Sequence, residues 1–443
     1  MNIKHSTFKG GIHPPGRKEL TSGKELVIAK APETVVIPML MHSGSPAKPL
    51  VKKGDLVKVG QCIGEPKGFI SAMVHSSVSG EVIAVEPRLH PKGQKIVSVV
   101  IKSDMQDTLY EEVKPKGDLE SLSPEEIKQI VQEAGIIGMG GAAFPTHVKL
   151  TPRKGKTVEH IILNGAECEP YLTSDEYIMN NHADKVVFGL RAMMKCMGVQ
   201  RGYIGIEDNK KEAIEAISKA LGNDESIELF SLHTKYPQGY KDQLITAIIG
   251  KEVPSGGSSA DVGAVVFNVG TAAAISDAIQ EGMPLIERIV TISGGAVKNP
   301  SVLKAKIGAN IADLIENCGG FSEEPTKIIN GGPMTGLAQY SPDIPLLKET
   351  TGISCLTKEE AEVPNPQLCI RCGKCASICP VRLLPLYIAE YSLNGDYEKC
   401  KKYHALDCME CGSCSYICPS KRTLLSSIRV AKREIIANSR KEK

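Results

Sequence analysis

Apolar and polar positions follow different periods in different parts of the chain. From residue 34 to about residue 101, apolar residues form short runs separated by turn sequences such as Lys53-Gly54-Asp55. Short runs with regular glycine turns are typical of strands in a small β-barrel or sandwich. We therefore predict a β-rich unit over residues 31–104. Residues 1–30 are rich in Gly, Pro, His and Lys without any period, which predicts an extended N-terminal arm.

Strand-like runs alternate with helical spacing between residues 119 and 285. Ser123 is followed by Pro124 and by Glu126, which predicts the start of a helix with a capping box. The expected strands are residues 160–163, 202–206, 226–232 and 264–267, and the expected helices are residues 183–197, 211–221 and 240–249. Such alternation predicts an α/β domain with a mostly parallel sheet.

The last third of the chain changes pattern again. Residues 286–347 predict a small α+β unit with strands at 289–293 and 327–332 and a helix at 311–317. Residues 348–366 are polar and contain proline, which predicts a linker. Residues 360–443 contain cysteine motifs and helical stretches. The end of that segment is basic with an apolar stripe, so we expect a helix that packs on the cysteine motifs. Docking of this helix on anionic lipid or an acidic partner is the alternative.

The composition excludes several classes of protein. A chain of 443 residues is long enough for several domains, here multidomain α/β and α+β. The net charge of +2 and the pI near 7.8 argue against a dedicated nucleic-acid binder. No secretory leader pattern begins the sequence, and no stretch of 18 residues is uninterruptedly apolar. The sequence therefore predicts a soluble protein of a reducing compartment.

Cysteine spacing gives the most specific signal. Nine of the 14 cysteines lie between residues 369 and 418, and eight of them form two runs of the pattern C-x-x-C-x-x-C-x-x-x-C-P. This pattern is typical of ferredoxins with two 4Fe-4S clusters, in which the fourth cysteine of each run binds the other cluster. The predicted ligand sets are Cys369, Cys372, Cys375 and Cys418 for one cluster, and Cys408, Cys411, Cys414 and Cys379 for the other.

The cysteines allow two other interpretations. Zinc needs four ligands in one tetrahedron, usually from two C-x-x-C pairs, and two complete four-cysteine runs fit that poorly. A purely structural role for two clusters stays open, although adjacent low-potential centres are the usual construction of a one-electron path.

The glycine-rich segment at residues 138–146 is the second candidate site. It formally matches the dinucleotide fingerprint, but a helix precedes it and Pro145 follows closely, so a Rossmann loop is excluded. A loop of exposed N–H groups suited to a phosphate or a flat ring remains, as does an ordinary surface turn. Residues 164–170 and 268–271 each follow a predicted strand, where ligands of open α/β sheets bind.

These segments resemble a known family. The sequences GMGGAAFPTHVKL (138–150) and NGAECEP (164–170) resemble the flavin-binding, NADH-oxidising subunit of respiratory complex I. Together with FKGGIHPP (8–15) and the twin cysteine motifs, the whole chain resembles the C subunits of the Rnf complexes, ion-translocating NADH:ferredoxin oxidoreductases of bacteria.

The resemblance implies a role for each block. Residues 31–104 would form a barrel-sandwich hybrid similar to lipoyl domains, without a lipoyl lysine at residues 71–75. Residues 119–285 would bind FMN and NADH, residues 286–347 would form a soluble-ligand-binding β-grasp domain, and residues 360–443 would carry two clusters.

The resemblance also assigns cofactor contacts. The residues that match FMN-binding positions are Gly138, Gly140, Gly141 and Asn164, with Asn268 and Thr271 near the flavin. Phe144 would stack near the nicotinamide or adenine, Lys149 would meet a phosphate, and Glu167 and Glu169 would contact hydroxyls of FMN or NADH. Complex I relatives commonly carry Arg in place of Met139 and Asp in place of Ala166, so this chain lacks those two contacts.

The implied function is electron input to a membrane complex. The chain would be peripheral, on the cytoplasmic side of the inner membrane. It would exchange hydride between NADH and non-covalent FMN and pass single electrons through two 4Fe-4S clusters. Its partners would be integral membrane and ferredoxin-like subunits, which transport the ion and reach ferredoxin. No side chain is expected to act as a catalytic acid or base.

Two alternatives remain. A cobalamin-reductase-like flavo-iron-sulfur protein shares the flavin and cluster modules, but residues 8–15 and the β-rich unit argue against it. A non-catalytic scaffold that carries the clusters stays open because of Met139 and Ala166.

Overall fold

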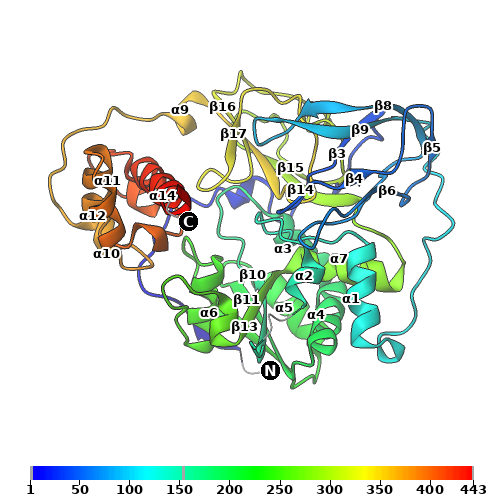
Figure 1. The fold of residues 1–443 in the computed structure, drawn as a ribbon, viewed down its shortest axis with the longest axis horizontal. Helices are drawn as coiled ribbons and strands as arrows, with labels where there is room; N and C mark the ends of the chain where they lie inside the picture. The colour runs from blue at the N-terminus through cyan, green and yellow to red at the C-terminus, as the bar shows by residue number, and fades with distance from the viewer. Residues whose placement is uncertain (1–2, 152–154, 442–443) are drawn as a thin grey trace.

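The computed structural model describes residues 3–151 and 155–441. Its elements form an α/β unit, a β-barrel unit, a mixed sheet and a small helical unit (Figure 1). The helical unit, which carries both cysteine motifs, lies at one end of the molecule and is joined to the mixed sheet by the segment after helix α9 (Lys358–Ala361).

The α/β unit contains a five-stranded parallel sheet in the order β1-β12-β11-β10-β13. Its strands are β1 (Lys4–Ser6), β10 (His160–Gly165), β11 (Arg201–Glu207), β12 (Ile227–Leu232) and β13 (Ala264–Asn268). Its helices are α1 (Pro124–Glu133), α2 (Thr146–Lys149), α3 (Ser174–Asn181), α4 (Ala183–Met197), α5 (Lys211–Leu221), α6 (Lys241–Ile249) and α7 (Val269–Gln280). The predicted alternation and the capping box of Ser123 and Glu126 are confirmed.

The strand order fixes where a ligand can enter. From β10 the chain moves outward through β11 and β12, and it then returns to the other side of β10 as β13. The carboxyl ends of β10 and β13 therefore meet at the point where the order reverses, the usual ligand position of open α/β sheets. Asn164 and Asn268 are paired in register at these two ends.

The mixed sheet has six strands in the order β17-β16-β18-β14-β15-β2. The elements of this unit are β2 (Val27–Ile28), β14 (Glu287–Ser293), β15 (Ser301–Lys306), α8 (Ile311–Asn317), β16 (Lys327–Asn330), β17 (Leu337–Gln339) and β18 (Gly352–Leu356). The predicted linker over residues 348–366 is wrong in part, because β18 lies inside the sheet and α9 follows it. The five residues of β18 are all buried, but Gly352 and Ser354 interrupt the apolar pattern that would identify a strand.

The β-barrel unit is built from two sheets, β3-β9-β8-β5 and β4-β6-β7. Its strands are β3 (Thr34–Pro38), β4 (Lys48–Pro49), β5 (Leu56–Val57), β6 (Cys62–Glu65), β7 (Val74–His75), β8 (Gly80–Leu89) and β9 (Lys95–Ser103). Ile37, Val99 and Ile101 are completely buried between them. The prediction of a β-rich unit is confirmed.

The N-terminal arm ties three units together. Strand β1 extends the parallel sheet beside β12, and β2 extends the mixed sheet beside β15. Between them the Gly11 amide donates to the carbonyl of Ile378 at 2.8 Å. Gly10 has a φ of +86°, and a Cβ there would lie 2.8 Å from the same carbonyl. Neither strand was predictable, since strands of two or three residues carry no recognisable period.

The helical unit is made of short helices and one long helix. They are α10 (Lys374–Ser377), α11 (Pro385–Leu393), α12 (Tyr397–Lys402), α13 (Ser413–Tyr416) and α14 (Leu424–Lys441). Helix α14 buries Leu424, Ile428, Ala431 and Ile435 in this unit, so the expected packing of the basic helix is confirmed. None of the helices in the described residues is long and apolar enough to cross a membrane.

Candidate cofactor site and cluster sites

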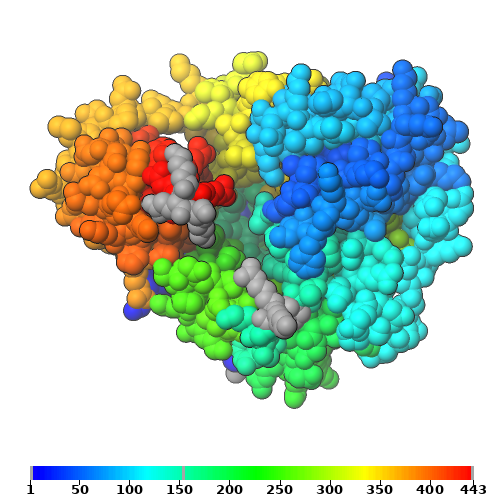
Figure 2. Space-filling model, in the orientation of Figure 1, coloured from blue at the N-terminus to red at the C-terminus, as the bar shows by residue number. Residues whose placement is uncertain are grey.

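A cavity of about 430 Å³ opens at the carboxyl ends of β10 and β13. This volume lies within the range of about 300–1,000 Å³ that is usual for ligand sites. The molecular surface is hollowed between the α/β unit, the mixed sheet and the helical unit (Figure 2). A larger cavity, of about 880 Å³, lies between the barrel and the mixed sheet, but none of its lining residues belongs to the parallel sheet.

Several segments from different units line the smaller cavity. They include Gly140, Gly141, Ala142, Asn164, Glu167, Cys168, Glu169, Asp175, Tyr236, Tyr240, Asn268, Lys92, Glu349, Thr350 and Thr351. The structure thus brings together six of the predicted cofactor residues: Gly140, Gly141, Asn164, Glu167, Glu169 and Asn268.

Hydrogen bonds from outside the cavity hold the glycine-rich loop in place. The Met139 amide donates to Thr271 Oγ1 at 3.0 Å, and the Gly138 amide donates to the carbonyl of Phe144 at 2.8 Å. From the barrel unit, Ser43 donates its amide to the carbonyl of Ala143 at 2.8 Å. The Ser43 hydroxyl donates to the carbonyl of Ala142 at 2.9 Å. Because these bonds hold the loop at its outer side, Gly140 and Gly141 face the cavity without side-chain bulk.

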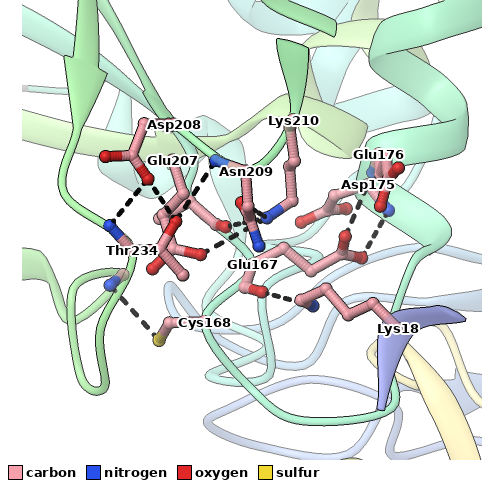
Figure 3. A network of polar contacts seen from close by, with 12 residues as sticks. Lys18, Glu167, Cys168, Asp175, Glu176, Glu207, Asp208, Asn209, Lys210 and Thr234 are labelled. Carbon is pink, nitrogen blue, oxygen red and sulfur yellow. Dashed lines mark hydrogen bonds and ion pairs between the residues drawn. The ribbon is translucent and has the colours of Figure 1, made fainter. Parts of the chain in front are cut away.

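The NGAECEP loop is held by its own acidic residue. Glu167 Oε1 accepts from the amide of Asp175 at 2.7 Å, and Oε2 accepts from the amide of Glu176 at 3.2 Å (Figure 3). Its carboxylate therefore caps the first turn of α3, where free N–H groups favour a negative charge. Both oxygens of Glu167 accept from amides of α3, so a ligand hydroxyl as predicted would have to bind to the same oxygens.

Two lysines lie under the same loop. Lys18 of the arm donates to the carbonyls of Glu167, Glu169 and Leu172 at 2.8, 3.2 and 2.6 Å. Lys210 is almost completely buried and donates to the carbonyl of Ala166 at 2.7 Å. It also donates to Glu207 Oε2 at 3.3 Å (Figure 3). A buried cation with several acceptors fixes the path of a loop that has no regular structure.

Glu169 connects the loop to the mixed sheet. Its Oε2 accepts from the amide of Met334 at 3.0 Å, and its Oε1 accepts from the hydroxyl of Thr335. Burial raises the pKa of this carboxyl, while these two bonds act in the opposite direction.

Asn268 and Asp175 form a polar pair on the cavity wall. Asn268 Nδ2 donates to Asp175 Oδ2 at 2.6 Å, and Asn268 Oδ1 accepts from the amide of Gly270 at 2.8 Å, which caps α7. Burial, followed by the charge of Glu167, raises the pKa of Asp175 to about 7. The sequence prediction missed Asp175, although its place in the first turn after the NGAECEP loop was a usable signal.

Four predicted cofactor residues do not line this cavity. Thr271 and Gly138 hold the glycine-rich loop from its outer side. The Lys149 ammonium donates to the carbonyl of Val266 and lies 4.7 Å from the centre of the Phe267 ring, and burial lowers its pKa to about 8. Phe144 is half-buried and does not line the cavity, and its carbonyl accepts from the amide of Gly138.

The structure brings the cysteines together in the two predicted crossed sets. Cys369, Cys372, Cys375 and Cys418 line one small cavity, and we call them the outer set. Cys408, Cys411, Cys414 and Cys379 form the inner set. Burial raises the pKa of Cys414 to about 12, and Cys408, Cys411 and Cys379 add to this shift through their charges. In the described residues, no three Cys, His, Asp or Glu side chains are placed to share a single metal ion.

The two sets differ in exposure. Cys369 and Cys372 of the outer set are exposed, whereas in the inner set Cys414 is buried and the other three are half-buried. Leu368 and Ile370, beside the outer set, are 88% and 67% exposed.

Tyr236 connects this cavity to the inner set. Its side chain is 2% exposed and lines the cavity. Its hydroxyl donates to the carbonyl of Cys411 at 2.8 Å. No local pattern indicates this contact, because it joins a loop of the α/β unit to a turn of the helical unit.

Comparison with protein families agrees with this arrangement. The Nuo51 FMN-binding domain matches residues 131–277, and the RnfC barrel sandwich hybrid domain matches residues 6–106. The SLBB domain matches residues 289–338, and the 4Fe-4S dicluster domain matches residues 368–422. The chain belongs to the C subunits of the ion-translocating ferredoxin:NAD⁺ oxidoreductase complexes.

Whole relatives support that assignment. The chain is 57% identical to the C subunit of the Na⁺-translocating complex of Acetobacterium woodii, over all of both chains. It is 48% identical to the C subunit of the proton-translocating complex of Clostridium ljungdahlii, over 99% of this chain and 96% of the relative. A chain of an NAD⁺-reducing NiFe hydrogenase shares the fold with a TM-score of 0.50 at 16% identity, covering 73% of this chain and 63% of that chain.

Proposed function

We propose that this chain is the electron-input subunit of an ion-translocating ferredoxin:NAD⁺ oxidoreductase complex. NADH and FMN bind in the cavity at the ends of β10 and β13, and electrons travel between that cavity and a partner subunit through two 4Fe-4S clusters. Ion transport and ferredoxin contact belong to other subunits, since each relative is named as one subunit of a larger complex. We place the chain at the cytoplasmic face of the membrane, where NADH is available.

The observation that carries this proposal is the position of Tyr236. One buried side chain lines the cavity and donates to the backbone of an inner-set cysteine. Continuous packed atoms therefore lie between the cavity and the inner cluster, and the exposed outer cluster is left to exchange electrons with a partner.

The side chains around the cavity fit FMN and NADH. Bound FMN supplies the exchange between a two-electron hydride and single electrons. Gly140 and Gly141 present backbone to a flat ring or phosphate, Asn164 and Asn268 present side chains from the strand ends, and Glu169 closes the side toward the mixed sheet. The protein positions the reacting groups and keeps water away, and no side chain needs to give or take a proton.

The visible spectrum of anaerobic, FMN-reconstituted protein tests the proposal. On addition of NADH, we expect the flavin bands and the broad cluster absorbance to bleach together. Cluster absorbance that dithionite bleaches but NADH does not would contradict the proposal and favour a non-catalytic scaffold.

A further inference from the structure

The cavity has a wall that none of the predicted cofactor residues belongs to. It is formed by the segment at residues 347–351, which precedes β18, and by the hairpin between β8 and β9. Pro91 and Lys92 of that hairpin reach the cavity, and Gln339 holds the hairpin by donating to the carbonyl of Pro91 at 3.0 Å. The mixed sheet and the barrel unit therefore contribute to the site in addition to the α/β unit.

Glu349 is the one acidic side chain of this wall. Its side chain is 10% exposed and lines the cavity. Neither Oε1 nor Oε2 accepts a hydrogen bond of good geometry from the described residues. A described cation beside it is the ammonium of Lys92, 3.5 Å from Oε1, on a side chain that is 42% exposed. A carboxylate that is buried with so few donors is costly, so such a group marks a place where a ligand supplies them.

The position of Glu349 is fixed from both sides. The neighbouring Lys348 is almost completely buried and donates to the carbonyls of Met73 and Gly135 at 2.9 and 2.7 Å. On the other side, Arg288 Nε of β14 donates to the carbonyl of Thr350 at 3.1 Å. These bonds anchor the backbone of the segment to all three neighbouring units. The backbone that carries Glu349 is therefore fixed at the cavity wall.

Arg288 places a hydrogen-bond donor, unpaired in the described part of the chain, beside the same wall. Its side chain is buried, Nη2 donates to the carbonyl of Met139 at 3.4 Å, and Nη1 has no partner among the described residues. The positive charge of Arg288 therefore lies beside the backbone of the glycine-rich loop. Arg288 and Lys92 both favour the charged form of Glu349, against the effect of burial, which raises its pKa.

We propose that Glu349 is a cofactor-binding residue that accepts hydrogen bonds from hydroxyl or imide N–H groups of the nucleotide in this cavity. FMN and NADH both carry such donors, on the ribityl chain and imide of the flavin and on the riboses of the dinucleotide. This inference rests on the proposed function and adds to it a contact from outside the flavin-binding domain. It implies that the segment before β18 takes part in ligand recognition.

The test compares Glu349→Leu and Glu349→Gln with the wild type, using protein that carries both clusters. In the first arm, FMN is removed and titrated back, and its Kd is measured by calorimetry. In the second arm, NAD⁺ is titrated into the FMN-loaded protein. Glu324→Gln, on an exposed side chain of the same unit, is the matched control.

The loss of a charged acceptor is expected to weaken binding roughly ten- to a hundredfold in Glu349→Leu, and by about threefold in Glu349→Gln, which keeps one acceptor oxygen. Weakening confined to the FMN arm assigns the donors to the flavin, and weakening confined to the NAD⁺ arm assigns them to the dinucleotide. The cofactor-free Glu349→Leu protein is expected to have a Tm roughly 2 °C higher, because an unsatisfied carboxylate has been removed. A purely structural role for Glu349 predicts a lower Tm instead.

Unchanged Kd values in both arms for both variants would overturn the inference, because Glu349 would then contact neither nucleotide. Equal weakening in Glu324→Gln would also overturn it. Wild-type protein that binds neither FMN nor NAD⁺ would contradict the proposed function itself, which is a different result.

Discussion

The turn that begins at Cys369 and the turn that begins at Cys408 share their local construction but not their surroundings. Each turn has a positive-φ residue two positions after its first cysteine, Arg371 at 54° and Glu410 at 59°. Each has a glycine in the same region two positions further on, Gly373 at 73° and Gly412 at 80°, just before a short helix. The same cysteine spacing therefore gives the two turns the same pattern of backbone φ angles.

The surroundings separate the two turns. Cys411 lies under the hydroxyl of Tyr236 and next to the cofactor cavity, while Cys369 and Cys372 are exposed beside apolar side chains. In the proposed function, the spacing sets which thiols share a cluster, and the tertiary contacts set what each cluster exchanges electrons with. Substitutions around the inner set and substitutions around the outer set should therefore change different clusters.

Removing one ligand from each set is expected to give opposite results. Cys379→Ser removes an inner-set ligand and should abolish reduction of the outer cluster by NADH, while dithionite still reduces it. Cys418→Ser removes an outer-set ligand and should leave reduction of the inner cluster by NADH intact. Electron paramagnetic resonance and iron content measure both. Cys196→Ser, on α4, is the control. Reduction of the outer cluster at the wild-type rate in Cys379→Ser would contradict the assignment.

Lys18→Met should weaken FMN binding without changing either cluster. The variant leaves three loop carbonyls without their charged donor, which costs about 2 kcal/mol of folding free energy and loosens the NGAECEP loop. We expect weaker FMN binding and a lower unfolding midpoint, with both cluster spectra unchanged. Lys24→Met, which removes one exposed bond from the same arm, should have little effect. Equal losses in the two variants would show that Lys18 has no special role.

Tyr236→Phe should change one cluster and spare the other. The variant keeps the ring and removes the hydroxyl that donates to Cys411. Only the part of this bond that strengthens on reduction shifts the potential, so a bond of about 0.5–1.5 kcal/mol allows a shift of up to roughly 60 mV for one electron. The inner cluster should become harder to reduce. Redox titration followed by electron paramagnetic resonance measures both potentials. Tyr203→Phe, on β11 with its hydroxyl against His160, is the control. A shift in the reduction potential of the outer cluster instead would contradict the contact between Tyr236 and the inner cluster.

Mild acid should weaken the barrel unit and spare the helical unit. Burial lowers the pKa of His42 and His90 to about 4 and that of His75 to about 3. The unfolded chain takes up these protons near pH 6.5 and the folded chain does not, so stability falls as the pH drops below 6.5. Between pH 7 and pH 6, each histidine should cost roughly 0.7 kcal/mol.

Hydrogen exchange at several pH values measures this effect by region. Amides of β6 and β7 should lose protection as the pH falls, and amides of α11 and α14 should keep it. Equal loss in both regions would mean that the buried histidines do not control the response.

The regular parts of the fold could be predicted from the sequence. Strands β10 to β13 and helices α4 and α5 carry enough apolar period to be found. The cysteine spacing predicts the crossed ligand sets, and the proximity of the thiols within each set agrees with that prediction. The glycine-rich loop and the NGAECEP loop were recognisable because each follows its element directly in the chain.

The rest of the site depends on contacts between units. Tyr236, Lys92 and Glu349 reach one cavity from three units, and no local pattern connects them. Lys149 lies in a recognised motif, but its side chain turns toward Val266 and Phe267, which only the packing decides. Strand β18 was hidden for the same reason, since its burial comes from neighbouring strands.

The order in which the clusters receive electrons is the central claim, and rapid-freeze electron paramagnetic resonance after mixing with NADH tests it most directly. The signal of the inner cluster is identified first in Cys418→Ser, which carries that cluster alone. In the wild type, this signal should appear before the signal of the outer cluster. An outer signal that appears first, or an outer signal that forms in Cys379→Ser as fast as in the wild type, would contradict the account.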